Sequence, residues 1–247
     1  MIQVIPYCGT PPTPVDLAGR FNLDPLLIAA LAVLGIGHVV LSRSRRMRWQ
    51  ACAGWLTVSA ALLSPLCALS VSLFSARVAQ HMLMLLVAAP FIALALPRDQ
   101  SPRSSRPLWT ASLAFLLALW FWHMPTPYAA TFTSNITYWL MHVSLFGSGL
   151  WLWRELLHHP PERTAQALAA GLASSAQMGL LGAVLALSGY AQFEPHFLTA
   201  PLWHLTSLQD QQLGGVVMWV PGIVLFLWAA VRSLRRLWTE MAGPRAA

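Results

Sequence analysis

The sequence predicts an all-α membrane protein, a single transmembrane domain over residues 1–247 with about seven membrane-spanning helices. Three observations predict this fold. Hydrophobic residues make up 57% of the 247 residues and charged residues only 9%, far below the roughly 25% of a soluble domain. Seven apolar segments are long enough to cross a bilayer, which takes about 20 residues each. The arginines gather between alternate segments, as in membrane proteins with one basic side.

The apolar segments have the composition of spans throughout. Each is apolar around its whole circumference, unlike the one-sided stripe of a soluble helix. The alternation of a membrane β-barrel strand is missing. The start of the chain lacks the charged and apolar regions of a cleavable signal, so the first segment is expected to remain as a span. The predicted spans are 24–42, 50–70, 76–97, 108–124, 136–157, 165–189 and 211–232.

The distribution of arginine predicts the orientation of the helices. Of the 15 arginines, 13 fall on one predicted side, and only Arg20 and Arg77 fall on the other. The positive-inside rule makes the arginine-rich side cytoplasmic. We therefore expect a multi-pass protein of the cytoplasmic membrane, with its N-terminus outside and its C-terminus in the cytoplasm. The net charge of +7 then reflects topology and contacts with membrane lipid, and it does not predict a nucleic-acid partner.

Histidines gather at the predicted outer ends of the spans. His81 and His142 each lie five or six residues inside a span that begins at the outer face, so their imidazoles are expected at one depth. His123 ends the fourth span on the same side, and the last outer loop adds His196 and His204. An ionisable side chain inside a membrane is a functional-site candidate.

Sulfur side chains accompany these histidines. Cys67 ends the second span at the outer face, and Met141 precedes His142. Imidazole, thioether and thiolate together suit copper, above all Cu(I). Asp210, at the outer start of the last span, is expected to orient a histidine or to attract the cation. The predicted metal ligands are His81, His123, His142, Cys67 and Met141.

Each of these residues also has an ordinary structural interpretation. A lone histidine near an interface usually makes a hydrogen bond there, and Cys67 is typical of a small buried residue. Arg77 is long enough to reach lipid headgroups. Trp151 and Trp153 fit the aromatic belt at a membrane surface. The three cysteines do not suggest a disulfide framework.

Two other functions use the same features. His81 and His142 at one depth suit the two axial positions of a haem b, which would make the chain a redox protein. A copper transporter needs polar or sulfur side chains through the middle of the bilayer. The sixth span offers such residues, namely Ser174, Ser175, Gln177 and Met178.

Three stretches, at 73–90, 121–153 and 208–222, resemble the CtaG-like cytochrome c oxidase assembly factors, which are associated with caa-type oxidases. Their most specific elements are QHML, WHMP and DQQLGG followed by MWVPG. The resemblance implies a non-catalytic membrane factor that aids the copper centre of a haem-copper oxidase from the outer face. It implies oxidase subunit I, or another oxidase subunit, and a periplasmic copper donor as partners. The positions that match the family pattern are His81, His123, His142 and Asp210.

The sequence departs from the family pattern at four positions. Arg77 and Tyr138 stand where the pattern has histidines, four residues before His81 and His142 respectively. Cys67 and Met141 stand where it has acidic residues. We therefore expect Arg77 and Tyr138 to lie beside the metal ligands. We expect Cys67 and Met141 to be among the ligands.

Overall fold

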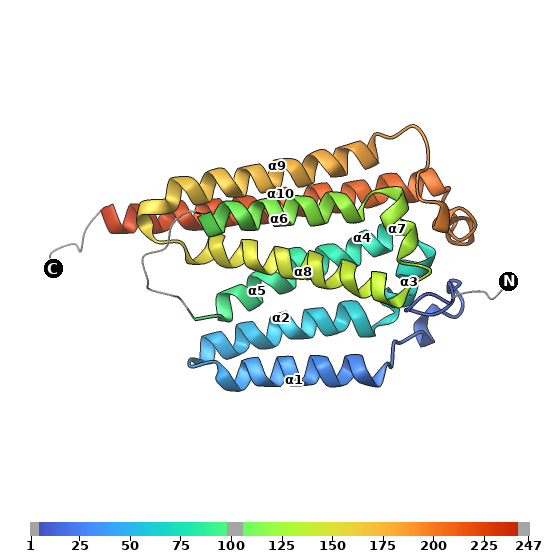
Figure 1. Cartoon of the computed structure of the whole chain (residues 1–247), viewed down its shortest axis with the longest axis horizontal. Coiled ribbons are helices and arrows are strands. Elements are labelled where there is room, and N and C mark those ends of the chain that lie inside the picture. The colour runs from blue at the N-terminus through green and yellow to red at the C-terminus, as the bar shows by residue number, and fades with distance from the viewer. Residues whose placement is uncertain (1–4, 98–105, 242–247) are drawn as a thin grey trace.

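The computed structural model describes residues 5–97 and 106–241, and every regular element in these two ranges is helical. The long helices run side by side, with α1 and α2 at one edge and α9 and α10 at the opposite edge (Figure 1). Short 3-10 turns cover Leu17–Gly19, Pro161–Arg163, Glu194–His196 and Ala200–Trp203. The helices are α1 (Pro25–Leu41), α2 (Arg45–Leu63), α3 (Pro65–Ser72), α4 (Phe74–Met82), α5 (Ala89–Ala95), α6 (Arg106–Trp122), α7 (Pro125–Ala130), α8 (Asn135–His158), α9 (Thr164–Ala186) and α10 (Ser207–Met241).

Helix covers most of each of the seven predicted spans, which confirms the all-α prediction for the described residues. Three continuous helical segments in these ranges are long and apolar enough to cross a membrane, and a bent pair makes a fourth. Pro25–Leu41 and Pro107–Trp122 are apolar but shorter. The three long segments are Phe74–Ala95, Pro161–Ala186 and Ser207–Thr239, and the bent pair is Arg45–Leu63 with Pro65–Ser72.

The second predicted span is not straight, because Ser64 and Pro65 divide it. α2 and α3 meet there at an angle of 50°. Proline fits the first turn of a helix but has no N–H to continue the preceding one. The Ser64 hydroxyl accepts a hydrogen bond from the N–H of Leu66 and caps α3. Residues 65–72 therefore turn across the end of the bundle.

A π-helical turn, Leu83–Ala88, joins α4 to α5 within the third predicted span. Such a turn leaves backbone groups outside the regular i→i−4 ladder. The indole of Trp153 on α8 donates to the carbonyl of Leu85 at 2.7 Å. Trp153 is only 1% exposed. Its predicted place in an interfacial belt is therefore wrong, because its N–H satisfies a buried carbonyl.

α9 and α10 approach each other through glycine. A Cβ at Gly215 would lie 2.5 Å from the carbonyl oxygen of Gly182 and 2.5 Å from the nitrogen of Ala186. Only hydrogen at these positions lets the two backbones touch, as small residues do between helices in membranes.

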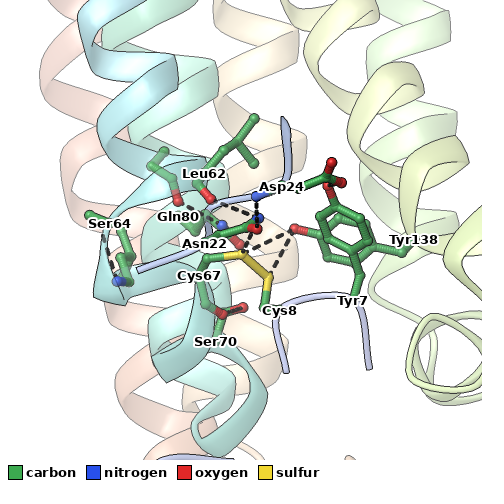
Figure 2. The surroundings of a disulfide bond; sticks show 12 residues. Tyr7, Cys8, Asn22, Asp24, Leu62, Ser64, Cys67, Ser70, Gln80 and Tyr138 are labelled. Atoms are coloured by element: carbon green, nitrogen blue, oxygen red, sulfur yellow. Dashed lines mark hydrogen bonds between the residues drawn. A yellow bond between two sulfur atoms is a disulfide. The ribbon is translucent and has the colours of Figure 1, made fainter. Parts of the chain in front are cut away.

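A disulfide joins Cys8 to Cys67, with Cα atoms 5.4 Å apart (Figure 2). The number and spacing of the three cysteines did not suggest a disulfide framework, and the structure corrects this. The bond ties residues 5–24, which we call the N-terminal strap, to α3. The ring of Tyr7 also stacks on Tyr138 of α8, with centroids 4.8 Å apart. The strap thus crosses the end of the bundle at which α3 and α7 lie (Figure 1).

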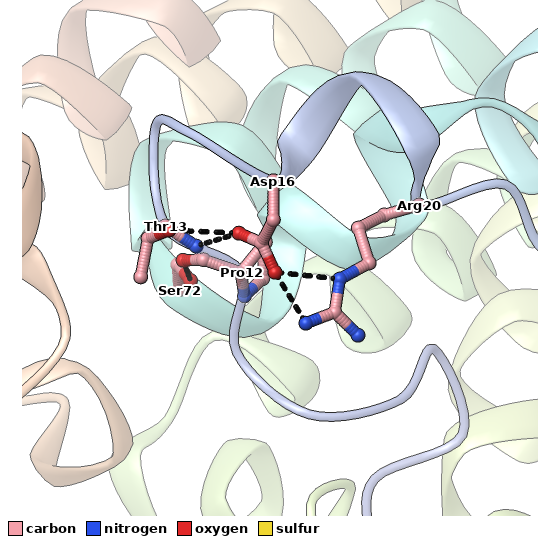
Figure 3. Close-up of polar contacts among 5 residues, drawn as sticks. All are labelled: Pro12, Thr13, Asp16, Arg20 and Ser72. Atoms are coloured by element: carbon pink, nitrogen blue, oxygen red, sulfur yellow. Dashed lines mark hydrogen bonds and ion pairs between the residues drawn. The ribbon is translucent and has the colours of Figure 1, made fainter.

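Further contacts fix the strap. The Ser72 hydroxyl donates to the carbonyl of Pro12 at 2.9 Å (Figure 3). The Asp16 carboxylate accepts hydrogen bonds from Thr13 and from the guanidinium of Arg20. These contacts, with Arg20 first, lower the pKa of Asp16 to about 2. Asp24 ends the strap by accepting from the N–H of Leu26 and so capping α1.

Candidate metal-binding site

Three helices bring three imidazole rings together. His81 lies on α4, His123 follows the last residue of α6, and His142 lies on α8. The ring of His81 is 5.8 Å from that of His123 and 5.2 Å from that of His142, measured between centroids. All three are buried. The side chains predicted to share a depth thus also face one another, and His81 lies between the other two.

In two of these rings, a backbone carbonyl determines which nitrogen carries the hydrogen. Nδ1 of His123 lies 2.7 Å from the carbonyl oxygen of Leu119, and Nδ1 of His142 lies 3.0 Å from that of Tyr138. A carbonyl oxygen only accepts hydrogen bonds, so each Nδ1 carries the hydrogen. Each Nε2 then keeps its lone pair. Metal-binding histidines are held in the same way, through a hydrogen bond from the other ring nitrogen.

Four ring nitrogens of these histidines have no hydrogen-bond partner among the described residues. They are both nitrogens of His81, Nε2 of His123 and Nε2 of His142. A buried polar atom without a partner costs about 1–3 kcal/mol, so such atoms are uncommon and require a reason. A role in binding a cation would explain these unpaired nitrogens, because the lone pairs of imidazole nitrogens can bind a cation.

The residues fit a metal in donor chemistry and only partly in geometry. Nitrogen–metal bonds of about 2.0 Å place imidazoles that share an ion roughly 5–6 Å apart between centroids, and the two measured separations fall in this interval. However, no group of three or more His, Cys, Asp or Glu side chains in residues 5–97 and 106–241 could hold an ion as it stands. Binding an ion would therefore require these side chains to move.

The two predicted sulfur ligands have other roles in the structure. The sulfur of Cys67 is bonded to Cys8, so it is no thiolate here. Met141 is fully buried and packs in the main hydrophobic core. The described donor set is therefore nitrogen alone.

Tyr138 connects the disulfide to the histidines. Its ring lies 4.2 Å from the ring of His142 between centroids, and its hydroxyl lies 3.3 Å from Sγ of Cys8 (Figure 2). Its carbonyl is also the acceptor that orients His142. Tyr138 thus stands beside the predicted ligand His142, and it lies between that ring and the strap.

Arg77 lies one helical turn before His81 and is 1% exposed. Its guanidinium donates to the carbonyl of Ser70 at 3.1 Å and to the hydroxyl of Thr131 at 3.3 Å. Its Cζ lies 4.5 Å from the ring centroid of Phe132, and the rings of Tyr128 and Tyr138 each lie at 5.6 Å. The alternative that it reaches out to headgroups is therefore wrong.

Asp210 contacts the start of α4. Its fully buried carboxylate accepts hydrogen bonds from the N–H of Phe74 at 2.6 Å and from the N–H of Ser75 at 3.0 Å. The hydroxyl of Ser75 donates to it as well. A carboxylate at a helix N-terminus satisfies free N–H groups and the helix dipole. Its hydrogen bonds within the described chain go to α4 and not to a histidine, so it positions the helix that carries His81.

The two histidines of the predicted last outer loop, His196 and His204, stand apart from the cluster. Nε2 of His196 lies 2.6 Å from the hydroxyl of Tyr128, and burial lowers the pKa of His196 to about 3. His204 is exposed, with a left-handed φ of 60°. The hydrogen bond between Tyr128 and His196 had no signal in the sequence, because it joins two loops far apart in the chain.

The helical fold and this buried cluster define a helical membrane protein with a histidine-rich candidate site. Residues 28–240 match the family of cytochrome c oxidase caa3 assembly factors (Caa3_CtaG), and the chain belongs to that family. The resemblance seen in the sequence is thereby confirmed. Neither a curated protein nor a solved structure matches the chain.

Proposed function

We propose that this chain binds Cu(I) at His81, His123 and His142 and helps to mature the copper centre of a cytochrome c oxidase. One observation carries the proposal: three buried imidazole rings from three neighbouring segments lie close together, with His81 5.8 Å from His123 and 5.2 Å from His142 between centroids, and four of their ring nitrogens have no partner among the described residues. The family supplies the link to an oxidase. The chain acts as an assembly factor and not as a catalyst.

The donor set favours Cu(I) over other ions. Neutral imidazoles bind copper and zinc readily. Zinc usually takes four protein ligands in a closed site, whereas Cu(I) is stable with two or three. Three histidines without a neighbouring carboxylate therefore suit Cu(I) better. Each imidazole would act through a ring nitrogen, and the carbonyls of Leu119 and Tyr138 would hold two rings in the required tautomer.

We also propose that the protein has seven membrane spans and acts from the outer face of the membrane. The concentration of arginine on one side supports this orientation. The disulfide between Cys8 and Cys67 supports it too, because disulfides persist in oxidising compartments such as the periplasm. The proposed partners are oxidase subunit I, or another oxidase subunit, and a periplasmic copper donor.

A Cu(I) titration tests the site. The protein is purified in detergent, loaded anaerobically with Cu(I) and titrated with a chromophoric chelator. We expect the double variant His81→Ala/His142→Ala to lose at least tenfold in affinity. His204→Asn is the matched control, because His204 is exposed and asparagine tolerates a left-handed φ. Equal Cu(I) affinities in the wild type and the double variant would rule out the proposed site.

Two further measurements separate the alternatives. An absorption spectrum of the purified protein reports a haem b through its Soret band, and a band that disappears in His142→Ala would favour the redox function. Copper uptake by vesicles reports transport. Within the sixth predicted span, the Gln177 carbonyl oxygen accepts from the indole of Trp120 at 2.9 Å, so this residue has a structural role already. We expect neither a Soret band nor uptake.

A further inference from the structure

The side chain of Arg77 is held in a fixed position close to the histidine cluster. Arg77 and His81 are four residues apart on one helix, so their side chains share a face. Tyr138 touches both groups: its ring lies 4.2 Å from the ring of His142 and 5.6 Å from Cζ of Arg77. Hydrogen bonds to Ser70 and Thr131 prevent the guanidinium from turning away.

The positive charge of Arg77 has no carboxylate to neutralise it within ion-pair distance in the described ranges. The buried carboxylate of Asp210 is engaged by the first turn of α4. In the strap, Asp16 pairs with Arg20, and Asp24 accepts from the hydroxyl of Tyr7. Besides its neutral acceptors on Ser70 and Thr131, the guanidinium contacts aromatic faces, which stabilise a cation by only about 0.5–2 kcal/mol each. The cluster of three neutral imidazoles therefore already has one unit of positive charge beside it.

We infer that Arg77 sets the charge of the ion that the histidine cluster accepts, so that the cluster takes a monovalent soft cation, Cu(I), and rejects divalent cations. A bound Cu(I) brings the buried charge to +2, whereas Zn²⁺ or Cu²⁺ would bring it to +3. Repulsion between charges is strong where water is excluded. The cost of an additional buried charge grows when no counter-ion compensates it. This inference rests on the proposed function. It names Arg77 as the residue that makes the proposed site selective for Cu(I).

The magnitude follows from Coulomb's law. A divalent ion carries one more unit of charge than Cu(I), and Arg77 opposes that unit. If the two charges lie about 8 Å apart and the effective dielectric constant is near 20, the extra repulsion corresponds to a factor of about 30 in affinity. The same repulsion favours the cuprous over the cupric state of a bound copper ion, so it raises the reduction potential of the site.

The test compares two variants of the purified full-length protein. Arg77→Met removes the charge and keeps an unbranched side chain between the rings, whereas Arg77→Lys keeps the charge. Affinities for Cu(I), Zn²⁺ and Co²⁺ are measured by competition with chelators. For Arg77→Met we expect the ratio of Zn²⁺ to Cu(I) affinity to rise at least tenfold and the copper reduction potential to fall. For Arg77→Lys we expect the wild-type ratio. An unchanged ratio and potential in Arg77→Met overturns the inference.

Measurements on the wild type keep the inference testable if Arg77→Met does not fold. Ag(I) is monovalent and soft like Cu(I), so the wild type is expected to bind Ag(I) at least tenfold more tightly than Zn²⁺ or Co²⁺. Zn²⁺ binding as tight as Ag(I) binding contradicts the role of Arg77 and leaves the proposed function standing. Loss of the proposed function itself has a different signature, namely Cu(I) affinity that does not depend on His81 and His142.

Discussion

The hydroxyl of Tyr128 is hydrogen-bonded to Nε2 of His196 at 2.6 Å, although the two lie 68 positions apart in the chain. Both residues are buried. Burial raises the pKa of Tyr128 and lowers that of His196, so the pair is a neutral phenol bonded to a neutral imidazole. This hydrogen bond joins α7 to the loop between α9 and α10.

Replacing Tyr128 by phenylalanine is expected to lower the free energy of unfolding by about 1–3 kcal/mol, because it leaves Nε2 of His196 buried without a hydrogen-bond partner. Thermal unfolding in detergent measures the change. Tyr190→Phe is the matched control, since Tyr190 is 70% exposed and surface changes usually stay within about 0.5 kcal/mol. Equal unfolding temperatures for the two variants would contradict this account.

Acid is expected to destabilise the protein through His196. The pKa of its imidazole is about 3 in the folded protein, against about 6.5 in an unfolded chain. The unfolded chain therefore binds a proton as the pH falls below about 6.5, while the folded protein does not. The stability from neutral His196 is present above pH 6.5 and is lost between about pH 6.5 and 3, by at most about 1.4 kcal/mol per pH unit. His196→Gln should unfold with a smaller difference between pH 7 and pH 5 than the wild type, and an identical difference would count against the prediction.

The disulfide between Cys8 and Cys67 is expected to protect both thiols from alkylation. Without reductant, the denatured protein should take up one maleimide, at the free and exposed Cys52. With reductant it should take up three. Three labels without reductant would show that the bond does not form. The double variant Cys8→Ser/Cys67→Ser should lose about 4 kcal/mol, because the bond joins residues 59 positions apart. Cys52→Ser is the control.

Asp210→Asn is expected to cost about 1–3 kcal/mol, because a neutral amide has one acceptor oxygen for a site where the carboxylate uses two. Loss of the charge at the N-terminus of α4 adds to this cost. The unfolding temperature measures it, with Glu194→Gln as the exposed control. Because α4 carries His81, weaker Cu(I) binding should accompany the lost stability. A variant as stable as the control would rule out the capping role.

Composition and the length of the apolar segments were sufficient to predict the helices, because the length and apolarity of a segment are properties of the segment itself. The gathering of His81, His123 and His142 could be expected from their positions near the outer ends of predicted spans. Which faces meet could not be deduced from depth alone, since it depends on how each helix is rotated about its axis.

Tertiary contacts account for the predictions that failed. Cys8 and Cys67 lie far apart in the sequence, and pairing among three cysteines has no local signal. Trp153 resembles any tryptophan near a membrane surface until its distant acceptor, Leu85, is known. The role of Asp210 depends on the break between α3 and α4, which frees the N–H groups of Phe74 and Ser75.

The π-helical turn at Leu83–Ala88 makes the third predicted span sensitive to how these residues wind. If they formed regular α-helix without a change in length, the extra residue that the π turn accommodates would rotate α4 relative to α5 by about 100°. With α5 held by α2, Arg77 and His81 would swing together away from Tyr138 and His142. The turn therefore determines how α4, which carries His81, is rotated relative to α5, which packs against α2.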